Sequence, residues 1–195
     1  MAALAALGQK LDERGTEPVS LLMCGGAALN ISGLLTRLTA DVDVLGAMHA
    51  NGELGEMPDW IYPLSAEVAE ALGLEKHWLN DAAASVTSMG LPSGILLRAT
   101  RQNFGKTLQV AIVSRLDLIA LKCFAALNPG VGEKHLGDLV DLNPLSEEMP
   151  FACGWTFSPR AAPKGDPEKR TCVREDFPID TKHQKVADLS VERCW

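Results

Sequence analysis

Aromatic residues and paired cysteines are scarce in this chain of 195 residues. Phe, Trp and Tyr make up 5% of the residues and the hydrophobic class 47%, so we expect an aliphatic core. The cysteines form an odd set that lacks both a Cys-x-x-Cys pair and a histidine at zinc-ligand spacing. They are Cys24, Cys123, Cys153, Cys172 and Cys194. This set argues against a disulfide framework and a structural zinc site, and it favours reduced thiols in the cytoplasm.

Long apolar runs and an excess of positive charge are also absent. The apolar start AALAALG is followed by charged residues from Lys10 onward, and no other run approaches the roughly 18 residues of a membrane-spanning helix. The net charge is -7, so the chain repels polyanions, and any contact with nucleic acid requires a local basic patch. We therefore expect a soluble, cytoplasmic protein without a membrane partner.

The length and the change in composition along the chain predict its domain organisation. At about 150 residues per domain, 195 residues correspond to one domain with a small appendage. From Thr156 onward prolines and charges are frequent, whereas periodic aliphatic residues are few. We predict one domain over residues 1–155 and a loosely ordered extension over residues 156–195.

The hydrophobic pattern predicts alternating helices and strands. Leu4, Leu7 and Leu11 recur at helical spacing, and the apolar run Val19–Cys24 is typical of a buried strand. The expected elements of the first half are a helix over 2–14, a strand over 19–24, a helix over 27–36, a strand over 41–45 and a loop over 46–63. Those of the second half are a helix from Ser65 to Gly73, a short helix near 80–81, a hairpin of strands 95–100 and 107–113, and helices over 116–127 and 132–142. This order predicts an α/β (α+β) fold with a small mixed sheet flanked by helices and a helical C-terminal part.

Two carboxylates and a glycine pair are the strongest chemical signal. Asp41 and Asp43 are two residues apart on a predicted strand, so their side chains leave one face about 7 Å apart and can converge on a hard cation. Gly25 and Gly26 lie between a strand and a helix, where a phosphate can approach the backbone amides and the helix N-terminus. Together they predict a triphosphate cradle facing a metal site, as phosphoryl and nucleotidyl transfer require.

Each of these features also has a purely structural interpretation. A glycine pair after a strand is most often a turn, and Asp-x-Asp is common in loops. The combination in one segment favours the functional interpretation, because Arg37 and Thr39 directly precede the carboxylates and a guanidinium there could hold phosphate.

The segment GGAALNISGLLTRLTADVDV resembles the opening motif of the nucleotidyltransferase-fold superfamily, in particular of small bacterial nucleotidyltransferases similar to AbiEii-type toxins and DUF6036-like proteins. In that superfamily the motif is a glycine followed by Gly or Ser, a helix, and then Asp-x-Asp. The resemblance implies a nucleotidyltransferase-like sheet in which Gly25 and Gly26 bind the nucleotide phosphates. It also implies that Asp41 and Asp43 hold Mg²⁺ and are catalytic.

Later segments resemble further motifs of the same family, so that the likeness covers about residues 19–155. These segments are WLNDAA, RLDLIALKCFAAL and EKHLGDLVDL. The resemblance implies a catalytic role for Lys122 and nucleotide contacts for Arg37, Thr39, Lys134 and Asp138.

The two lysines have structural alternatives. Lys122 can equally be a helix-edge lysine whose charge reaches water, and Asp138 can equally pair with Lys134 on a helix surface. We therefore expect that replacing Lys122 by Met, which keeps most of the stem, changes the stability little.

One departure from the family leaves two functions open. Many members add a third carboxylate from a later strand, but LQVAIVS contains no acid, and Asp117 is the nearest substitute. The first function is a Mg²⁺-dependent transfer of a nucleoside monophosphate from an NTP to an RNA such as tRNA, to a protein or to a small molecule, as in the toxin of a toxin–antitoxin pair. The alternative is a catalytically reduced binding module that pairs with an antitoxin protein. A dinucleotide-binding Rossmann enzyme is excluded because the Gly-x-Gly-x-x-Gly spacing is missing.

Overall fold

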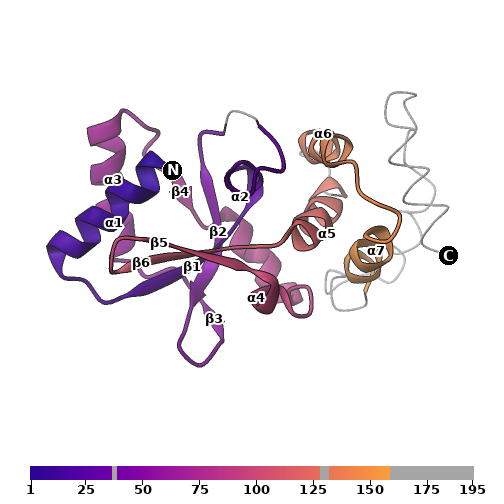
Figure 1. Cartoon of the computed structure of the whole chain (residues 1–195), viewed down its shortest axis with the longest axis horizontal. Helices are drawn as coiled ribbons and strands as arrows, with labels where there is room; N and C mark the ends of the chain where they lie inside the picture. The colour runs from indigo at the N-terminus through magenta and orange to yellow at the C-terminus, as the bar shows by residue number, and fades with distance from the viewer. Residues whose placement is uncertain (37–38, 128–131, 159–195) are drawn as a thin grey trace. The chain divides into compact units, whose positions relative to one another are not determined.

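The computed structural model of the chain describes residues 1–36, 39–127 and 132–158 (Figure 1). These residues contain a six-stranded mixed sheet and eight helices, one of them a 3-10 helix, which confirms the predicted α/β fold class with its helical C-terminal part. They divide into two compact units. The sheet unit comprises Met1–Ser88 and Ser93–Ser114, and the helical unit comprises Met89–Pro92 and the described residues from Arg115 onward. Most of the predicted extension, from residue 159 onward, lies outside the described residues.

The sheet unit is built on strands in the order β3-β2-β1-β6-β5, with β4 paired to β2 (Figure 1). The strands are β1 Val19–Cys24, β2 Val42–Met48, β3 Leu54–Gly55, β4 Leu79–Asn80, β5 Thr100–Phe104 and β6 Leu108–Ile112. Strand β1 runs parallel to β6 and antiparallel to β2, and β2 runs parallel to β4. The C-terminal ends of β1 and β6 therefore lie at the same end of the sheet as the start of β2.

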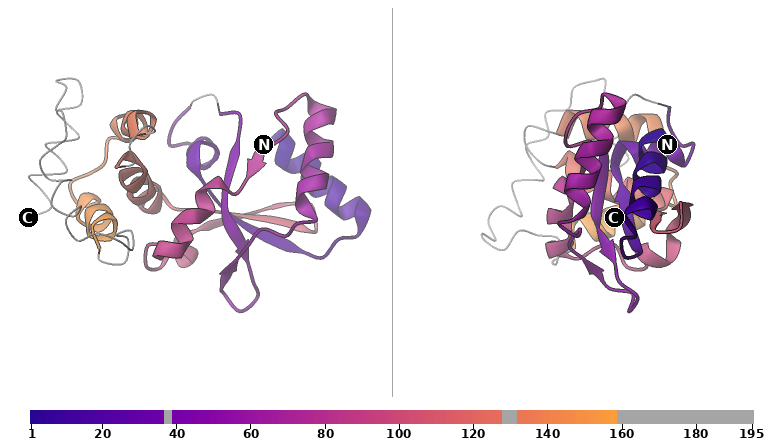
Figure 2. Two further views of the ribbon diagram at one scale, coloured as in Figure 1. Left: turned by 180° about the vertical axis from the view of Figure 1, so that it is seen from behind. Right: turned by 90° about the vertical axis from the view of Figure 1, so that its left-hand side faces the viewer.

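Helices of the sheet unit pack through aliphatic residues. They are α1 Ala2–Arg14, α2 Gly25–Ile31, α3 Ile61–Leu72, the 3-10 helix Ala82–Met89, of which only Met89 is assigned to the helical unit, and α4 Ile95–Arg98. Helix α1 lies beside α3 (Figure 2) and packs on β5, and its Leu4, Leu7 and Leu11 are at most 1% exposed. The Asp12 carboxylate accepts the N–H of Lys106 at 2.9 Å, which joins the end of α1 to the β5–β6 turn. The predicted helix over 2–14 and its aliphatic contacts are thus confirmed.

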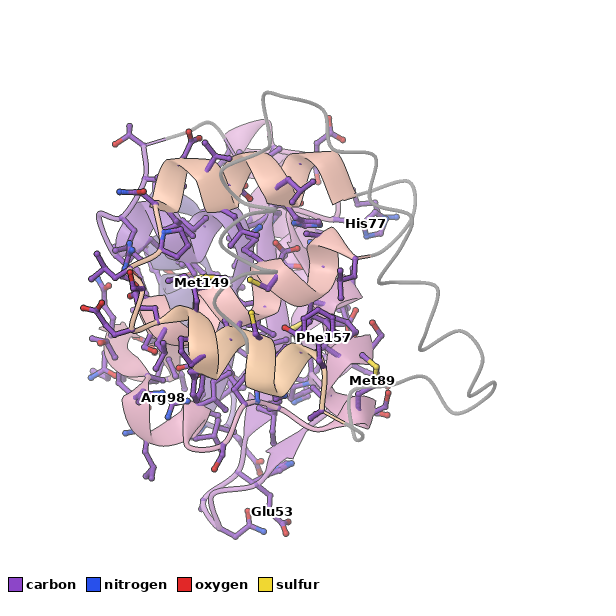
Figure 3. All side chains as sticks on the ribbon, turned by 90° about the vertical axis from the view of Figure 1, so that its right-hand side faces the viewer. Glu53, His77, Met89, Arg98, Met149 and Phe157 are labelled. Atoms are coloured by element: carbon purple, nitrogen blue, oxygen red, sulfur yellow. The ribbon has the colours of Figure 1, made fainter. Side chains whose placement is uncertain are left out.

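The helical unit contains α5 Arg115–Ala126, α6 Gly132–Leu142 and α7 Met149–Thr156 (Figure 3). Helix α5 packs against both α6 and α7. Met149, at the start of α7, is 2% exposed, whereas Phe157, just after α7, is 57% exposed (Figure 3). The Trp155 indole donates to the Gly90 carbonyl oxygen at 3.2 Å, which attaches the segment Met89–Pro92 to α7.

Several predicted boundaries are wrong. The expected loop over 46–63 contains the end of β2, the short β3 and the start of α3, so Ser65 lies inside α3 instead of capping it. The Ser65 hydroxyl donates to the Tyr62 carbonyl oxygen at 2.9 Å, as is common within helices. The expected strand over 95–100 is mostly α4, because a short apolar run does not by itself distinguish a helix from a strand.

The structure tests in part the expectations about reduced cysteines and about membrane-spanning helices. Cys24 and Cys123 are reduced thiols, as predicted, but Cys153 is disulfide-bonded, so the prediction of reduced thiols is wrong at that position. Burial raises the pKa of the Cys123 thiol to about 11. Over the described ranges, each helix is too short or too polar to cross a bilayer.

Candidate functional site

The candidate site of the sheet unit lies where β1 ends and α2 begins. Cys24, the last residue of β1, pairs with Asp43 on β2. Gly25 then opens α2 with a φ of +73°, a conformation that L-residues with side chains rarely adopt. A Cβ on Gly25 would collide with the Asp43 carboxylate and would lie 2.8 Å from its Cγ. Glycine is therefore required at this position both by the backbone and by the carboxylate beside it.

The helix that follows the glycine pair is shorter than the predicted phosphate cradle requires. Helix α2 begins at Gly25 instead of residue 27 and ends at Ile31, so it has only seven residues. Its dipole is correspondingly weak, and the space beside the Gly25 Cα is filled by the Asp43 carboxylate. Gly26 is buried in the first turn of α2, and its contact with a nucleotide phosphate stays a prediction.

The two predicted metal ligands lie at the start of β2. Asp43 is the second residue of β2, whereas Asp41 directly precedes the strand, and both side chains are half-buried. Between them, the N–H of Val42 donates to the Trp78 carbonyl oxygen at 2.5 Å, which fixes this end of β2 to the residue before β4. The backbone on both sides of Val42 is thus held by neighbouring chain segments.

Thr39 contacts Asp41. The Thr39 hydroxyl donates to Asp41 Oδ1 at 2.8 Å and lies 3.2 Å from the Asp41 carbonyl oxygen. The resemblance implied a nucleotide contact for Thr39, but its hydroxyl hydrogen is used by the carboxylate two residues later. Arg37, the other residue predicted to bind nucleotide in this segment, lies outside the described residues.

Sequence reasoning missed Asn80, which the parallel pairing of β4 with β2 brings opposite Asp43. The Asn80 side-chain oxygen accepts the N–H of Ala82 at 3.0 Å and begins the 3-10 helix. Next to it, Asp81 accepts a hydrogen bond from the Tyr62 hydroxyl at 2.8 Å; burial and this bond raise the pKa of Tyr62 to about 12. In the sequence, only the position of the polar pair Asn80-Asp81 directly after Trp78-Leu79 could have indicated these contacts.

The side chains at the start of β2 are of a chemical type that Mg²⁺ prefers. Carboxylate oxygens are ligands that Mg²⁺ prefers, and Mg²⁺ is commonly held by one or two carboxylates together with substrate phosphates and water. In the part of the chain that the structure describes, no group of three or more His, Cys, Asp or Glu side chains is arranged to hold a metal ion. Asp41 and Asp43 therefore suit a cation shared with a phosphate substrate better than a closed metal site built by protein ligands alone.

A second charged cluster lies inside the helical unit. Lys122 on α5 places its Nζ 2.7 Å from Asp138 Oδ2 on α6, and the two side chains are 7% and 3% exposed. His135 Nδ1 lies 3.3 Å from the same ammonium group. The expectation that Lys122 reaches water is wrong, because the ammonium is held between two buried or half-buried groups of α6.

The predicted partner of Asp138 is also wrong. Asp138 pairs with Lys122 on another helix, whereas Lys134, four residues before it, is exposed. A buried carboxylate that loses its cation is costly, so the expectation that Lys122→Met leaves the stability nearly unchanged no longer holds. Nucleotide contacts by Lys122, Lys134 and Asp138 stay predictions.

Arg115 makes a further ion pair in the helical unit. Its guanidinium donates to the Glu148 carboxylate from Nε at 2.8 Å and from Nη2 at 3.0 Å, and Nη2 also donates to the Leu142 carbonyl oxygen at 2.9 Å. Burial by itself would raise the pKa of Glu148, but the bonds from Arg115 and from the Leu145 N–H outweigh it and lower the pKa. Arg115 thus joins α5 to the end of α6 and to the residue before α7.

The predicted site residues consequently fall into two groups. Gly25, Asp41 and Asp43 lie in the sheet unit, and Lys122 and Asp138 form an ion pair in the helical unit. Asp117, the suggested third carboxylate, is fully buried on α5 in the helical unit.

Comparison with protein-family models, curated proteins and solved structures finds no match. Function is therefore inferred from the residues themselves.

Proposed function

We propose that the chain is a Mg²⁺-dependent nucleotidyltransferase that moves a nucleoside monophosphate from an NTP to an acceptor. The observation that carries the proposal is the packing of the Asp43 carboxylate against Gly25, where any side chain would collide with it. The glycine brings the backbone at the start of α2 close to the Asp43 carboxylate. A nucleotide phosphate near this backbone and a Mg²⁺ held by the carboxylates would thus be neighbours.

Each residue of the sheet-unit site has a role in this reaction. Asp41 and Asp43 would hold the cation, Gly25 lets the backbone lie close to the Asp43 carboxylate, and Gly26 supports the first turn of α2. When bound, Mg²⁺ would neutralise phosphate charge and favour deprotonation of the acceptor hydroxyl. The acceptor oxygen forms a bond to the α-phosphorus, the bond to pyrophosphate breaks, and the hydroxyl proton passes to solvent.

The acceptor is proposed from charge and from the resemblance. The required hydroxyl can be supplied by an RNA end such as that of a tRNA, by a protein side chain or by a small molecule. With a net charge of -7, the chain is expected to bind RNA only through local contacts and not along its length. A cytoplasmic location and an antitoxin protein as partner belong to the same proposal.

One observation favours a second function. Only two carboxylates, Asp41 and Asp43, lie at the start of β2, and among the described residues no third metal-ligating side chain joins them. A catalytically reduced member of the fold that binds a nucleotide or an antitoxin protein would need no more than this.

A labelling experiment separates the two functions. The full chain is incubated with each α-labelled NTP, Mg²⁺ and total RNA, and with Asp43→Asn and Asp59→Asn as variants; Asp59 is an exposed acid elsewhere in the sheet unit. We expect label on an RNA or on a protein with the wild type and with Asp59→Asn, and none with Asp43→Asn. Thermal stabilisation by NTP without label transfer would favour the reduced module, and the absence of both would reject the nucleotide site.

Lys134 provides a further arm of this experiment. An exposed lysine that contacts a triphosphate contributes a charge-assisted hydrogen bond of roughly 1.5–3 kcal/mol, so Lys134→Met is expected to weaken NTP binding by about ten-fold or more. Its melting temperature should stay that of the wild type because the side chain is exposed.

A further inference from the structure

One hydroxyl group makes a hydrogen bond within the segment that precedes β2. Thr39 Oγ1 carries a single hydrogen, and Asp41 Oδ1 accepts it at 2.8 Å. The same hydroxyl lies 3.2 Å from the Asp41 carbonyl oxygen, so both polar groups of Asp41 face one donor. The side chain of Asp41 is thereby oriented before any ligand binds.

We infer that Thr39 is a positioning residue that assigns one oxygen of Asp41, Oδ2, to the cation and so favours Mg²⁺ over Ca²⁺. The inference rests on the proposed function, because it needs Asp41 to be a metal ligand. It differs from the role that the resemblance implied, in which Thr39 contacts the nucleotide.

The first step of the argument concerns the charge of the donor. Asp41 is held by a neutral hydroxyl, which orients a carboxylate without cancelling its charge. A lysine in the same place would compete with a metal ion, as Lys122 would for Asp138. The hydroxyl therefore orders the ligand and leaves its charge for the cation.

The second step concerns the number of oxygens that Asp41 can offer. With Oδ1 engaged by Thr39, coordination through a single oxygen keeps the hydrogen bond, whereas coordination through both oxygens weakens it. Mg²⁺ demands near-octahedral geometry, whereas Ca²⁺ takes six to eight oxygens and often both oxygens of one carboxylate. Loss of the hydroxyl should therefore harm Mg²⁺ binding more than Ca²⁺ binding.

The test uses metal binding by the full chain, without any turnover. Mn²⁺ serves as the probe, its free concentration is read by electron paramagnetic resonance, and Mg²⁺ and Ca²⁺ are added as competitors. The variants are Thr39→Val, which keeps the shape without the hydroxyl, Thr39→Ala, which removes both, and Thr39→Ser, which keeps the hydroxyl. Thermal melts of each variant show that it is folded.

Outer partners of metal ligands typically contribute 10- to 100-fold to affinity, so we expect Thr39→Val and Thr39→Ala to weaken Mn²⁺ and Mg²⁺ by about ten-fold. Ca²⁺ should weaken less, so that the ratio of Mg²⁺ to Ca²⁺ affinity falls, and Thr39→Ser should restore the wild-type values. The restoration by serine separates this role from a merely structural one.

Other outcomes overturn the inference in distinguishable ways. Wild-type affinities and ratio in both Thr39→Val and Thr39→Ala would show that the hydroxyl does not position Asp41, while the proposed metal site itself would stand. Equal Mn²⁺ binding by the wild type and by Asp43→Asn would remove the metal site, and with it both the proposed function and the role of Thr39.

Discussion

The carboxylates near the start of β2 have different neighbours from two carboxylates of the helical unit. In the sheet unit, Asp41 accepts a hydrogen bond from the neutral hydroxyl of Thr39, and Asp43 lies against the bare Cα of Gly25. In the helical unit, Asp138 is paired with a buried lysine. Glu148 likewise receives two bonds from an arginine. The difference is clearest for Asp41, because a neutral hydroxyl orients its carboxylate without cancelling the charge, whereas Lys122 and Arg115 bring a positive charge to their carboxylates.

Backbone hydrogen bonds account for part of this difference. Strands of the sheet unit are joined to one another by backbone hydrogen bonds. Helices satisfy their backbone groups internally, so neighbouring helices are joined largely through side chains. Ion pairs accordingly join helices in both units: Lys10 of α1 lies 2.6 Å from Glu67 of α3, and Lys122 of α5 lies 2.7 Å from Asp138 of α6.

The largest effect that tests this comparison is expected for Lys122→Met. Removing one partner of a buried ion pair leaves an uncompensated charge and typically costs 3–5 kcal/mol, so we expect a loss of roughly that size in the free energy of unfolding. Urea denaturation of the full chain measures it. Lys134→Met, which removes an exposed lysine one helix away in the sequence, is the matched control and should change the stability by less than about 0.5 kcal/mol.

A double variant determines whether the uncompensated charge is the cause. Lys122→Met combined with Asp138→Asn has no buried charge at this contact and should be more stable than Lys122→Met alone. If the double variant is as unstable as the sum of the single ones, the side chains act independently and the ion pair does not join α5 to α6.

A smaller effect is expected when the glycine of the sheet-unit site is changed. Gly25→Ala combines a positive φ of +73° with a collision against Asp43, and strain and overpacking of this kind cost about 1–3 kcal/mol each. Gly33→Ala is the matched control, because Gly33 has a similar φ of +66° and open space around its Cα. Denaturation midpoints of the two variants isolate the collision, and equal losses would show that Asp43 does not press on Gly25.

Local patterns in the sequence predicted much of the fold. Three predicted elements are confirmed: the strand β1, the helix that contains Leu4, Leu7 and Leu11, and the helix over 132–142. Each was predicted from residues close together in the sequence, either from their hydrophobic spacing or from the residues that end the element. The sequence also placed Gly25 near Asp43, and the structure shows them in contact, because the antiparallel pairing of Cys24 with Asp43 brings the end of β1 to the start of β2. Their roles in binding phosphate and metal stay predictions.

Contacts between residues that are far apart along the chain could not be predicted from the sequence. Lys122 and Asp138 lie on separate helices, and the nearer pairing of Asp138 with Lys134 at helical spacing was the only one that a local rule could suggest. Asn80 reaches Asp43 through a two-residue strand, β4, which is too short to leave a periodic signal.

The smallest expected effect concerns the pH dependence of the Arg115–Glu148 pair. Although burial works against it, the bonds from Arg115 and the Leu145 N–H lower the pKa of Glu148 below its ordinary value of 4.5 in the folded chain. A lowered pKa means that the contribution of Glu148 to stability is present above the unfolded pKa and is lost as the pH falls through the folded one. Glu148→Gln keeps the shape but turns charge-assisted hydrogen bonds into neutral ones, so we expect it to lower the free energy of unfolding by about 1 kcal/mol at neutral pH. The gap between wild type and variant should narrow as the pH falls below about 4.5 and close once Glu148 is protonated in the folded chain, as measured by urea denaturation at each pH. A gap that does not change with pH would show that the ionised carboxylate does not join the helices, and the contrast with Asp41 in the sheet unit would then rest on Asp138 alone.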